Sequence, residues 1–388
     1  MEHNMKSTPF SFILPTKIRF GKGVISGLPE ELLGSGLKSV LIITDPVIAE
    51  LQCMTDIMGA LHSAGIQTEV FDQVEPNPKD RNVAAAAEKA AGMNAEALLA
   101  VGGGSPIDCA KAVSVVAALG GKTRDYEERK KINGPVLPLY TVPTTAGTGS
   151  EVTFSSVITD TTEHFKFTIK SPAIAPKVAF IDPDYTRSMP PVLTAAAGLD
   201  ALTHAVEAYT ANAANPLSDA CSLHAIELIN HHLITAVNQP SSSAARFGMM
   251  TGSLLAGIAF SHSDVASVHC LAEAIGGKYD TPHGICNAIA LPAVMEYNLD
   301  YAERRYARIA TAMGLQFPTL REGAILAVDR VKELVQESGL PAFSSLGVQE
   351  ADFQELAEKS EQNGSNIDNP RPMTAEDYVA ILKRLIEE

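Results

Sequence analysis

The chain changes its pattern once, near residue 185, and this change limits the possible folds more than any other feature. Before it, short runs rich in β-branched residues, such as Val40–Ile43 and residues 97–101, alternate with Ala-rich helical stretches. Strands separated by helices of this length form parallel βαβ units in a sheet that is covered on both faces. After Pro190-Pro191, nearly all apolar patterns have a helical period.

The sequence therefore predicts an α/β domain with a parallel sheet over residues 1–185 and an all-α domain over residues 186–388. A chain of 388 residues exceeds what one hydrophobic core usually covers. The cleft between two such domains is the default place for a ligand site. The predicted strands are 40–43, 97–101, 137–142 and 178–181, and the predicted helices are 83–93, 111–119, 195–209, 216–237, 243–260, 265–276, 284–297, 302–313, 320–337 and 374–386.

Composition narrows the classes of partner. Lys and Arg number 30 and Asp and Glu number 45, so that the net charge is −15. This balance argues against nucleic acid or a membrane surface as the main partner, because both attract concentrated positive charge. No stretch reaches the length of a membrane span, and MEHNMKSTPF lacks a signal-peptide pattern. Five cysteines without a CxxC pair argue against a disulfide framework or a zinc ribbon, so we expect a cytoplasmic globular enzyme.

A glycine-rich turn follows the predicted strand that ends at Val101. Its residues, Gly102-Gly103-Gly104-Ser105-Pro106-Ile107-Asp108, also open a helix. Glycines at such a turn let backbone amides approach a pyrophosphate, and the start of a helix favours negative charge. The pattern departs from GxGxxG, whose third glycine would fall at Ile107. A structural turn that needs positive φ explains the three glycines equally well.

Two further features lie at carboxyl ends of predicted strands, where ligands bind in open α/β sheets. Asp45 could hold an adenosine ribose and would repel a 2′-phosphate, which favours NAD over NADP, or it could be an ordinary turn aspartate. The run PTTAGTGSE at residues 143–151 offers hydroxyls and amides for phosphate and sugar, or forms a polar loop. Their coincidence with the glycine turn favours a dinucleotide site.

Four residues of the helical half have the chemistry of a metal site. Asp200 and His204 are four residues apart in the helical window GLDALTHAVEAY, so that carboxylate and imidazole share one face. His269 and His283 follow, the second in a Pro-His-Gly turn. One oxygen and three nitrogens suit Fe²⁺ or Zn²⁺. Two carboxylates could displace a member of this set, Glu207 on the His204 face and Glu273 on the His269 face.

Taken together, these motifs resemble the iron-containing (group III) alcohol dehydrogenase family. The resemblance rests on GGGSPIDCAK, PTTAGTGSEVT, GLDALTHAVEAY, the segment from His269 to Gly284 and the late Asn369-Pro370-Arg371-Pro372, in this order along nearly the whole chain. It implies a Rossmann-like dinucleotide-binding domain followed by an α-helical metal domain, an architecture like that of dehydroquinate synthase. It also implies NAD, a divalent metal (iron first, zinc as the alternative) and a homodimer or larger homo-oligomer.

The resemblance carries functional residues over, motif by motif. The implied metal ligands are Asp200, His204, His269 and His283. The implied cofactor contacts are Asp45, Asn77, Gly102, Gly103, Gly104, Ser105, Asp108, Thr144, Thr145, Thr148 and Lys166. We assign Phe260 and Ser155 to the substrate pocket.

Three residues depart from the family pattern. Glu273 stands where many relatives have a histidine near the nicotinamide, and His262 and Asp264 enter a segment expected to line the substrate pocket. We treat Glu273 and His262 as candidate catalytic residues. Glu273 could accept a hydrogen bond from His269, relay a proton or simply face solvent. His262 could titrate in its place or bind an anionic substrate tail.

The predicted reaction is reversible hydride transfer between NAD(H) and a small alcohol or aldehyde, with the metal as a Lewis acid on the substrate oxygen. One alternative is an aldehyde reductase for a phosphonate or sulfonate substrate. Another is a non-redox lyase of the dehydroquinate-synthase type, which would need a basic pocket that the metal motifs lack. A non-catalytic metal or nucleotide binder is the third.

Overall fold

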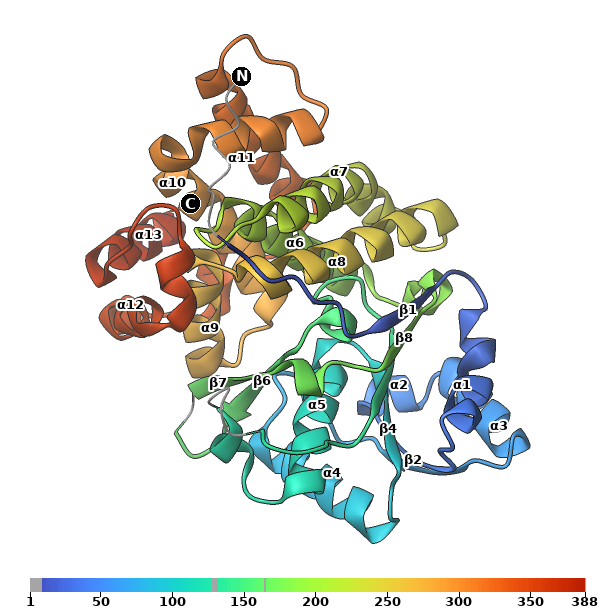
Figure 1. Cartoon of the computed structure of the whole chain (residues 1–388). Coiled ribbons are helices and arrows are strands. Elements are labelled where there is room, and N and C mark those ends of the chain that lie inside the picture. Colours follow the sequence, from blue (N-terminus) through green and yellow to red (C-terminus); the bar gives the residue numbers. More distant parts are fainter. Residues whose placement is uncertain (1–8, 128–131, 164, 388) are drawn as a thin grey trace. The chain divides into compact units, whose positions relative to one another are not determined.

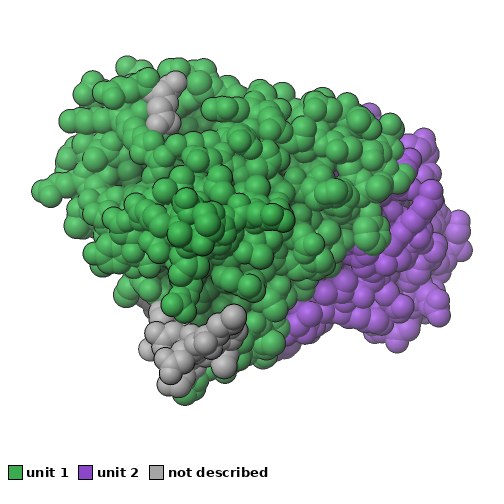
Figure 2. Space-filling view, turned by 90° about the horizontal axis from the view of Figure 1, so that it is seen from above, with its two compact units in different colours: residues 1–13, 146–148, 190–388 green, residues 14–145, 149–189 purple. Residues whose placement is uncertain are grey.

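The computed structural model describes residues 9–127, 132–163 and 165–387 (Figure 1). These residues form two compact units, which Figure 2 shows in different colours. The α/β unit consists of residues 14–145 and 149–189. The helical unit consists of the described residues before Leu14, residues 146–148 and the chain from Pro190 onward. The predicted division lies at residue 185, with the whole first part in one domain.

The α/β unit is built on a six-stranded parallel sheet. In spatial order its strands are β1 (Lys17–Phe20), β8 (Val178–Ile181), β5 (Leu139–Pro143), β4 (Ala97–Gly102), β2 (Ser39–Ile43) and β3 (Gln67–Phe71). The four predicted strands are present as β2, β4, β5 and β8. Successive side chains of a strand point to opposite faces, and both faces are buried: Val40 and Ile42 belong to one core, Leu41 and Ile43 to the other.

The connections change direction between β2 and β4. Helix α3 (Gln52–Ser63) leads from β2 to β3 and packs on the face of Val40, with α1 (Leu28–Gly34) beside it in the same core. Helix α4 (Asp80–Gly92) leads from β3 back to β4 and packs, like α5 (Gly104–Leu119), on the other face. Ligands of open α/β sheets bind outside the carboxyl ends of the strands at such a point.

Several elements were not predicted. They include the edge strands β1 and β3 and an antiparallel hairpin of β6 (Ser155–Asp160) and β7 (Phe165–Lys170). The side chains of β1 alternate between exposed and half-buried, and those of β3 do so up to Phe71, which is buried. The apolar signal of both edge strands is therefore weak. Helix α2 (Pro46–Ala49) is a single turn. Short 3-10 helices lie at Val24–Gly27, Thr123–Tyr126, Ser150–Val152, Pro172–Ile174, Pro183–Thr186, Phe343–Leu346, Glu350–Asp352 and Gly364–Asp368.

The helical unit contains long helices, most of them close to the predicted ranges. They are α6 (Pro191–Thr210), α7 (Pro216–Asn238), α8 (Ser243–Ser263), α9 (Ser267–Tyr279), α10 (His283–Ala312), α11 (Leu320–Glu337), α12 (Phe353–Gln362) and α13 (Ala375–Glu387). No single helix in the described ranges is long and apolar enough to cross a membrane, and α8 and α9 reach that criterion only as a pair bent by 100°.

The prediction of separate helices at 284–297 and 302–313 is wrong, because α10 runs through both and also contains Pro292. The polar residues from Asn298 onward suggested a break. In the structure Asn298 is buried and exchanges side-chain hydrogen bonds of 2.9 and 2.8 Å with Asn369. This tertiary contact outweighs the weak local propensity. Helix α12 was not predicted.

Candidate metal and dinucleotide sites

A cluster of side chains that could hold a metal ion lies in the helical unit. Asp200, His269 and His283 come from α6, α9 and α10, and each offers a ligand atom within 4.8 Å of those of the other two. His204, one turn after Asp200 on α6, lies beside them, with its Nδ1 3.8 Å from Asp200 Oδ2. Its ring centroid is 4.5 Å from that of His269. The structure therefore brings together all four residues that the sequence indicated.

The burial and protonation of these four side chains are compatible with a bound cation. The side chains of Asp200, His204 and His269 are 3%, 7% and 4% exposed, and that of His283 is 28% exposed. Burial opposes the charge of Asp200, but the neighbouring imidazoles outweigh it and keep the pKa of Asp200 below its usual value. Burial lowers the pKa of His204 to about 4, so its imidazole is neutral at neutral pH and keeps a lone pair for a metal.

Two buried nitrogen atoms test whether the site fits a metal ion. His204 Nδ1 and His269 Nε2 are buried and have no hydrogen-bond partner among the described residues. Buried polar atoms in proteins are nearly always paired, so such orphans need an explanation. A divalent cation held by one carboxylate and three imidazoles supplies one. The donor set therefore fits the metal that the resemblance implied.

Close packing of two helices brings His283 to Asp200. A Cβ at Gly284, the second residue of α10, would lie 2.5 Å from the carbonyl oxygen of Ala196 on α6. Only glycine permits this approach. One turn further along α10, Asn287 Nδ2 donates to Asp200 Oδ1 at 2.7 Å and lies 3.1 Å from His283 Nε2. Asn287 thus orients the carboxylate, and sequence reasoning did not identify it.

The two alternative carboxylates have different surroundings. Glu207 is buried and uses its oxygens at the start of α9: Oε2 lies 2.5 Å from Nδ1 of His269, and the amides of Ala266 and Val268 donate to it at 3.0 and 2.7 Å. Glu273 accepts a hydrogen bond of 2.7 Å from Asn363. The carboxylate that bonds His269 is therefore Glu207 and not Glu273. Burial opposes protonation of His269, and Glu207 outweighs it and raises the pKa of His269.

The segment that departs from the family lies beside the cluster. The ring of Phe260 stacks on that of His204 with centroids 4.4 Å apart. His262 Nδ1 lies 2.8 Å from the carbonyl oxygen of Ile258, and its Nε2 contacts the backbone N and O of Ile13 at 3.1 and 2.8 Å. Both ring nitrogens of His262 thus have backbone partners.

Asp264 has a φ of +62°, which L residues rarely adopt. Its Oδ1 accepts hydrogen bonds from the amide of Val265 at 3.0 Å and from the hydroxyl of Ser365 at 3.2 Å. These bonds hold the turn between α8 and α9 in this conformation.

In the α/β unit, the predicted cofactor residues follow adjacent strands. The glycine turn follows β4, Thr144 follows β5, and Asp45 follows β2. The Thr144 amide donates to the Gly102 carbonyl at 3.0 Å, and a Cβ at Gly103 would lie 3.0 Å from the Thr145 side chain. Gly102 has a φ of +150° and leaves no room for a Cβ against Pro106. The three features therefore meet at one edge of the sheet.

Several polar groups lie at this edge. Helix α5 begins at Gly104-Ser105 without a side-chain cap, so its first amides are available to an anion. The Thr144 hydroxyl is buried without a hydrogen-bond partner among the described residues. Asp45 Oδ1 caps α2 by accepting from the amides of Val47 and Ile48, both at 2.9 Å. Asp45 thus serves as a turn aspartate, and this role is compatible with a second role in binding the adenosine ribose.

Asp108, a predicted cofactor contact, and Ser155, which we assigned to the substrate pocket, take part in a buried network around Lys111. Sequence reasoning did not single out Lys111. Lys111 Nζ donates to Ser150 Oγ at 2.7 Å, Thr153 Oγ1 at 2.8 Å and the Ser155 carbonyl at 2.7 Å. Asp108 accepts from Ser150 Oγ at 2.5 Å. The network ties α5 to the segment that follows β5. Its partners lie about forty positions apart in sequence, beyond the reach of local patterns.

Asn77 and Lys166 are brought together, although they lie 89 positions apart: Lys166 Nζ donates to Asn77 Oδ1 at 2.8 Å. Asn77 has a φ of +50°, which asparagine tolerates better than most residues. Thr148 belongs to the helical unit with residues 146 and 147.

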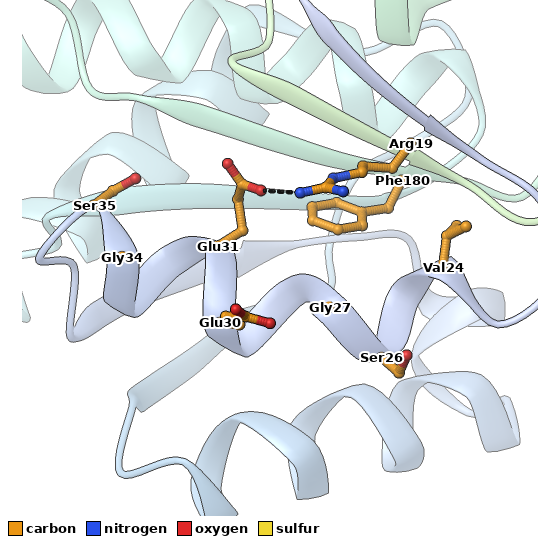
Figure 3. A pocket seen from close by; sticks show the side chains of 9 residues that line it. All are labelled: Arg19, Val24, Ser26, Gly27, Glu30, Glu31, Gly34, Ser35 and Phe180. Atoms are coloured by element: carbon orange, nitrogen blue, oxygen red, sulfur yellow. Dashed lines mark hydrogen bonds and ion pairs between the residues drawn. The ribbon is translucent and has the colours of Figure 1, made fainter.

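A hollow of about 620 Å³ in the α/β unit lies between β1 and α1 (Figure 3). Arg19 pairs with Glu31 across it at 3.1 Å, and Phe180 lies beside them. The hollow contains none of the residues that the sequence indicated for metal or cofactor.

Comparisons with known proteins agree with this architecture. Residues 15–183 match the family model "Iron-containing alcohol dehydrogenase", and residues 194–386 match "Fe-containing alcohol dehydrogenase family, C-terminal". The chain is 39% identical to a 1,3-propanediol dehydrogenase of Citrobacter freundii, over 97% of this chain and 98% of the relative. It is 38% identical to alcohol dehydrogenase 4 of Schizosaccharomyces pombe, over 97% and 90%.

A crystal structure of a 1,3-propanediol oxidoreductase superimposes with a TM-score of 0.95 at 38% identity, and the match covers 97% of this chain and 100% of that one. The predicted fold class is thereby confirmed. So is the resemblance from which the family was inferred. The chain belongs to the iron-containing alcohol dehydrogenase family and is an NAD-dependent oxidoreductase of that type.

Proposed function

We propose that the protein catalyses reversible hydride transfer between NAD(H) and a small alcohol or aldehyde at a divalent iron site formed by Asp200, His204, His269 and His283. One observation carries the proposal. The imidazoles of His269 and His283 converge on the carboxylate of Asp200, with His204 beside them. His204 Nδ1 and His269 Nε2 are buried and have no hydrogen-bond partner in the described chain. The names of the relatives, an alcohol dehydrogenase and a 1,3-propanediol dehydrogenase, support the substrate class.

The residues of the helical unit would bind and orient. Asp200 supplies the negative charge, and Asn287 holds its Oδ1 in place. His204 and His269 present lone pairs from a buried environment, whereas the more exposed His283 lies on the accessible side of the cluster. A divalent metal ion held there supplies Lewis-acid polarisation of a substrate oxygen. Phe260, stacked on His204, supplies an apolar contact for the carbon chain of a substrate.

The residues of the α/β unit would bind the dinucleotide. The amides at the start of α5 and the glycines before it suit the pyrophosphate. Asp45 suits the adenosine ribose and disfavours a 2′-phosphate. Thr144 offers a buried hydroxyl. We also assign cofactor contacts to Asn77, Ser105, Thr145 and Lys166 of this unit, and to Thr148, which the helical unit contains. Asp108 and Ser155 position the loop through Lys111.

The test uses metal-free protein reloaded with Fe²⁺ or Zn²⁺ and incubated with NAD and a series of simple alcohols. We expect net NADH formation that depends on the metal and is lost in His283→Ala together with bound metal. His224→Ala is the matched control, because this exposed histidine on α7 bonds only Glu227 among the described contacts. If the protein binds metal but neither forms net NADH from any alcohol nor oxidises NADH with any aldehyde, the proposal is contradicted and a non-redox reaction is favoured. Light scattering measures the homo-oligomer that the family resemblance implies.

A further inference from the structure

Glu207 is a buried carboxylate that the proposed ligand set does not use. It lies on α6, on the same face as Asp200 and His204, and is 3% exposed. A carboxylate in such a place is costly unless several donors satisfy it. Three donors do so: the amides of Ala266 and Val268 and the Nδ1 of His269.

We propose that Glu207 is a positioning residue that fixes both the tautomer and the place of the metal ligand His269; this inference rests on the proposed metal site. An ionised carboxylate only accepts hydrogen bonds, so the proton of the contact between Glu207 Oε2 and His269 Nδ1 belongs to the imidazole. The other ring nitrogen, Nε2, then carries the lone pair. That nitrogen is the buried one without a partner among the described residues.

The same carboxylate fixes where α9 begins. Its two oxygens accept from amides on either side of Ser267, the first residue of the helix. Negative charge at this end of a helix is also favoured by the helix dipole. Because Glu207 belongs to α6, one side chain ties the helix of Asp200 and His204 to the helix of His269. The spacing between ligands is thereby set before a metal arrives.

Charge balance supports the same role. The site has one carboxylate among its ligands, Asp200, and a second one, Glu207, directly behind His269. Together they compensate the charge of a divalent ion in a buried environment. A carboxylate behind a ligating imidazole also raises its basicity and strengthens its bond to a metal.

Glu273 provides a matched comparison on the neighbouring helix. It lies one turn after His269 on α9, but its carboxylate accepts from Asn363 instead of from the imidazole. Glu273→Gln removes one negative charge near His269 without removing a hydrogen bond to it. Glu207→Gln removes the same charge and also places an amide NH2 against N–H donors, since a glutamine has only one acceptor oxygen for three donors.

The experiment measures the affinity for Zn²⁺ and Fe²⁺ of metal-free protein by competition with a chelator, for the parent, Glu207→Gln, Glu207→Asp and Glu273→Gln. We expect Glu207→Gln to weaken binding by about 10- to 100-fold. Glu207→Asp, which keeps the charge, should lose less. Equal losses of metal affinity in Glu207→Gln and Glu273→Gln would mean that only the removed negative charge matters, and would overturn the proposal. Unchanged metal affinity in Glu207→Gln would also overturn it.

Nitrogen NMR of the parent protein gives a second readout that needs no variant. We expect the His269 imidazole to carry its proton on Nδ1 with and without Zn²⁺. The spectra are recorded above the raised pKa of His269, where the ring is neutral. A neutral ring with its proton on Nε2 in the metal-free protein overturns the proposal even if Glu207→Gln fails to fold. If the parent binds neither metal, the proposed metal site itself is wrong, so that the two failures are distinguishable.

Discussion

Two buried charged residues of the α/β unit differ in whether their charge is satisfied by hydrogen bonds. Lys111 is fully buried, and burial lowers its pKa to about 8, yet three oxygens satisfy its ammonium group. Glu151 is also buried, but its Oε1 has no hydrogen-bond partner in the described chain. Burial raises the pKa of Glu151 to about 7. Lys111 therefore stabilises the fold, whereas burial of the ionised Glu151 carboxylate destabilises it.

This cost gives stability a pH dependence that one substitution removes. The pKa of Glu151 is about 7 in the folded protein and 4.5 as the ordinary value, so the folded state binds more protons between these limits. Stability due to Glu151 is therefore present below pH 4.5 and lost as the pH rises through 7. Relative to the parent, Glu151→Gln should gain about 3 kcal/mol of unfolding free energy across this window. Urea titrations at several pH values measure the unfolding free energy of both proteins. A difference in unfolding free energy that does not change with pH would contradict this prediction.

A second residue-scale prediction concerns cofactor choice. The carboxylate of Asp45 would lie near a 2′-phosphate of NADP, and like charges repel. We expect the parent to prefer NADH, and Asp45→Ser to raise kcat/KM for NADPH by about tenfold. Serine is the right replacement because it retains a cap for α2, which Asp45 provides through Val47 and Ile48. Equal kcat/KM for both cofactors in the parent would remove the basis of this prediction.

Among single residues, sequence reasoning identified the candidates but not their partners. The spacing of Asp200 and His204 indicates a shared face, His269 and His283 complete a set with metal-site chemistry, and the family resemblance implies the same four ligands. Glu207 and Glu273 were equivalent by spacing, since each lies about one turn from a candidate histidine. Their difference arises from the turn between α8 and α9, which places the start of α9 at Glu207. No local pattern encodes that turn.

At the scale of elements, the contact between α6 and α10 determines the geometry of the metal cluster. The strands and helices with strong apolar periodicity were predictable, because a buried face requires apolar residues at regular positions in the sequence. The edge strands β1 and β3 and the hairpin β6–β7 were not, because their exposed positions carry polar residues. The continuity of α10 depends on the pair Asn298–Asn369, which joins distant parts of the chain.

Gly284→Ala tests this helix contact. The added Cβ would lie 2.5 Å from the Ala196 carbonyl oxygen, which is backbone and cannot rotate away. We expect α10 to move, with a loss of roughly 1–3 kcal/mol of unfolding free energy and weaker metal binding. Gly59→Ala on α3 is the control, since a Cβ there meets nothing within 4 Å and should leave stability unchanged or raise it. Unaltered metal affinity in Gly284→Ala would show that the contact does not position His283.

At the scale of the whole molecule, the two candidate sites belong to different compact units. The metal cluster lies wholly in the helical unit, and the glycine turn, Asp45 and Thr144 lie in the α/β unit. The chain passes from one unit to the other more than once, because residues 146–148 belong to the helical unit while both flanking segments belong to the α/β unit. Gly147 itself lies so close to α6 that a Cβ would be 2.9 Å from the Ala197 carbonyl oxygen. The units are therefore distinct in packing but not separable by a single cut.

This division predicts that the two ligands protect different elements from hydrogen exchange. A ligand that binds only the folded state stabilises it by about 4 kcal/mol when present at a thousand times its Kd. The gain is largest in the elements that hold the ligand, so Zn²⁺ should slow exchange most in α6, α9 and the first turns of α10. NADH should slow it at the ends of β2, β4 and β5 and at the start of α5. Exchange followed by mass spectrometry resolves these segments. Strong protection of the β4–α5 turn by Zn²⁺ alone, with none in α9, would contradict the assignment of the metal to the helical unit.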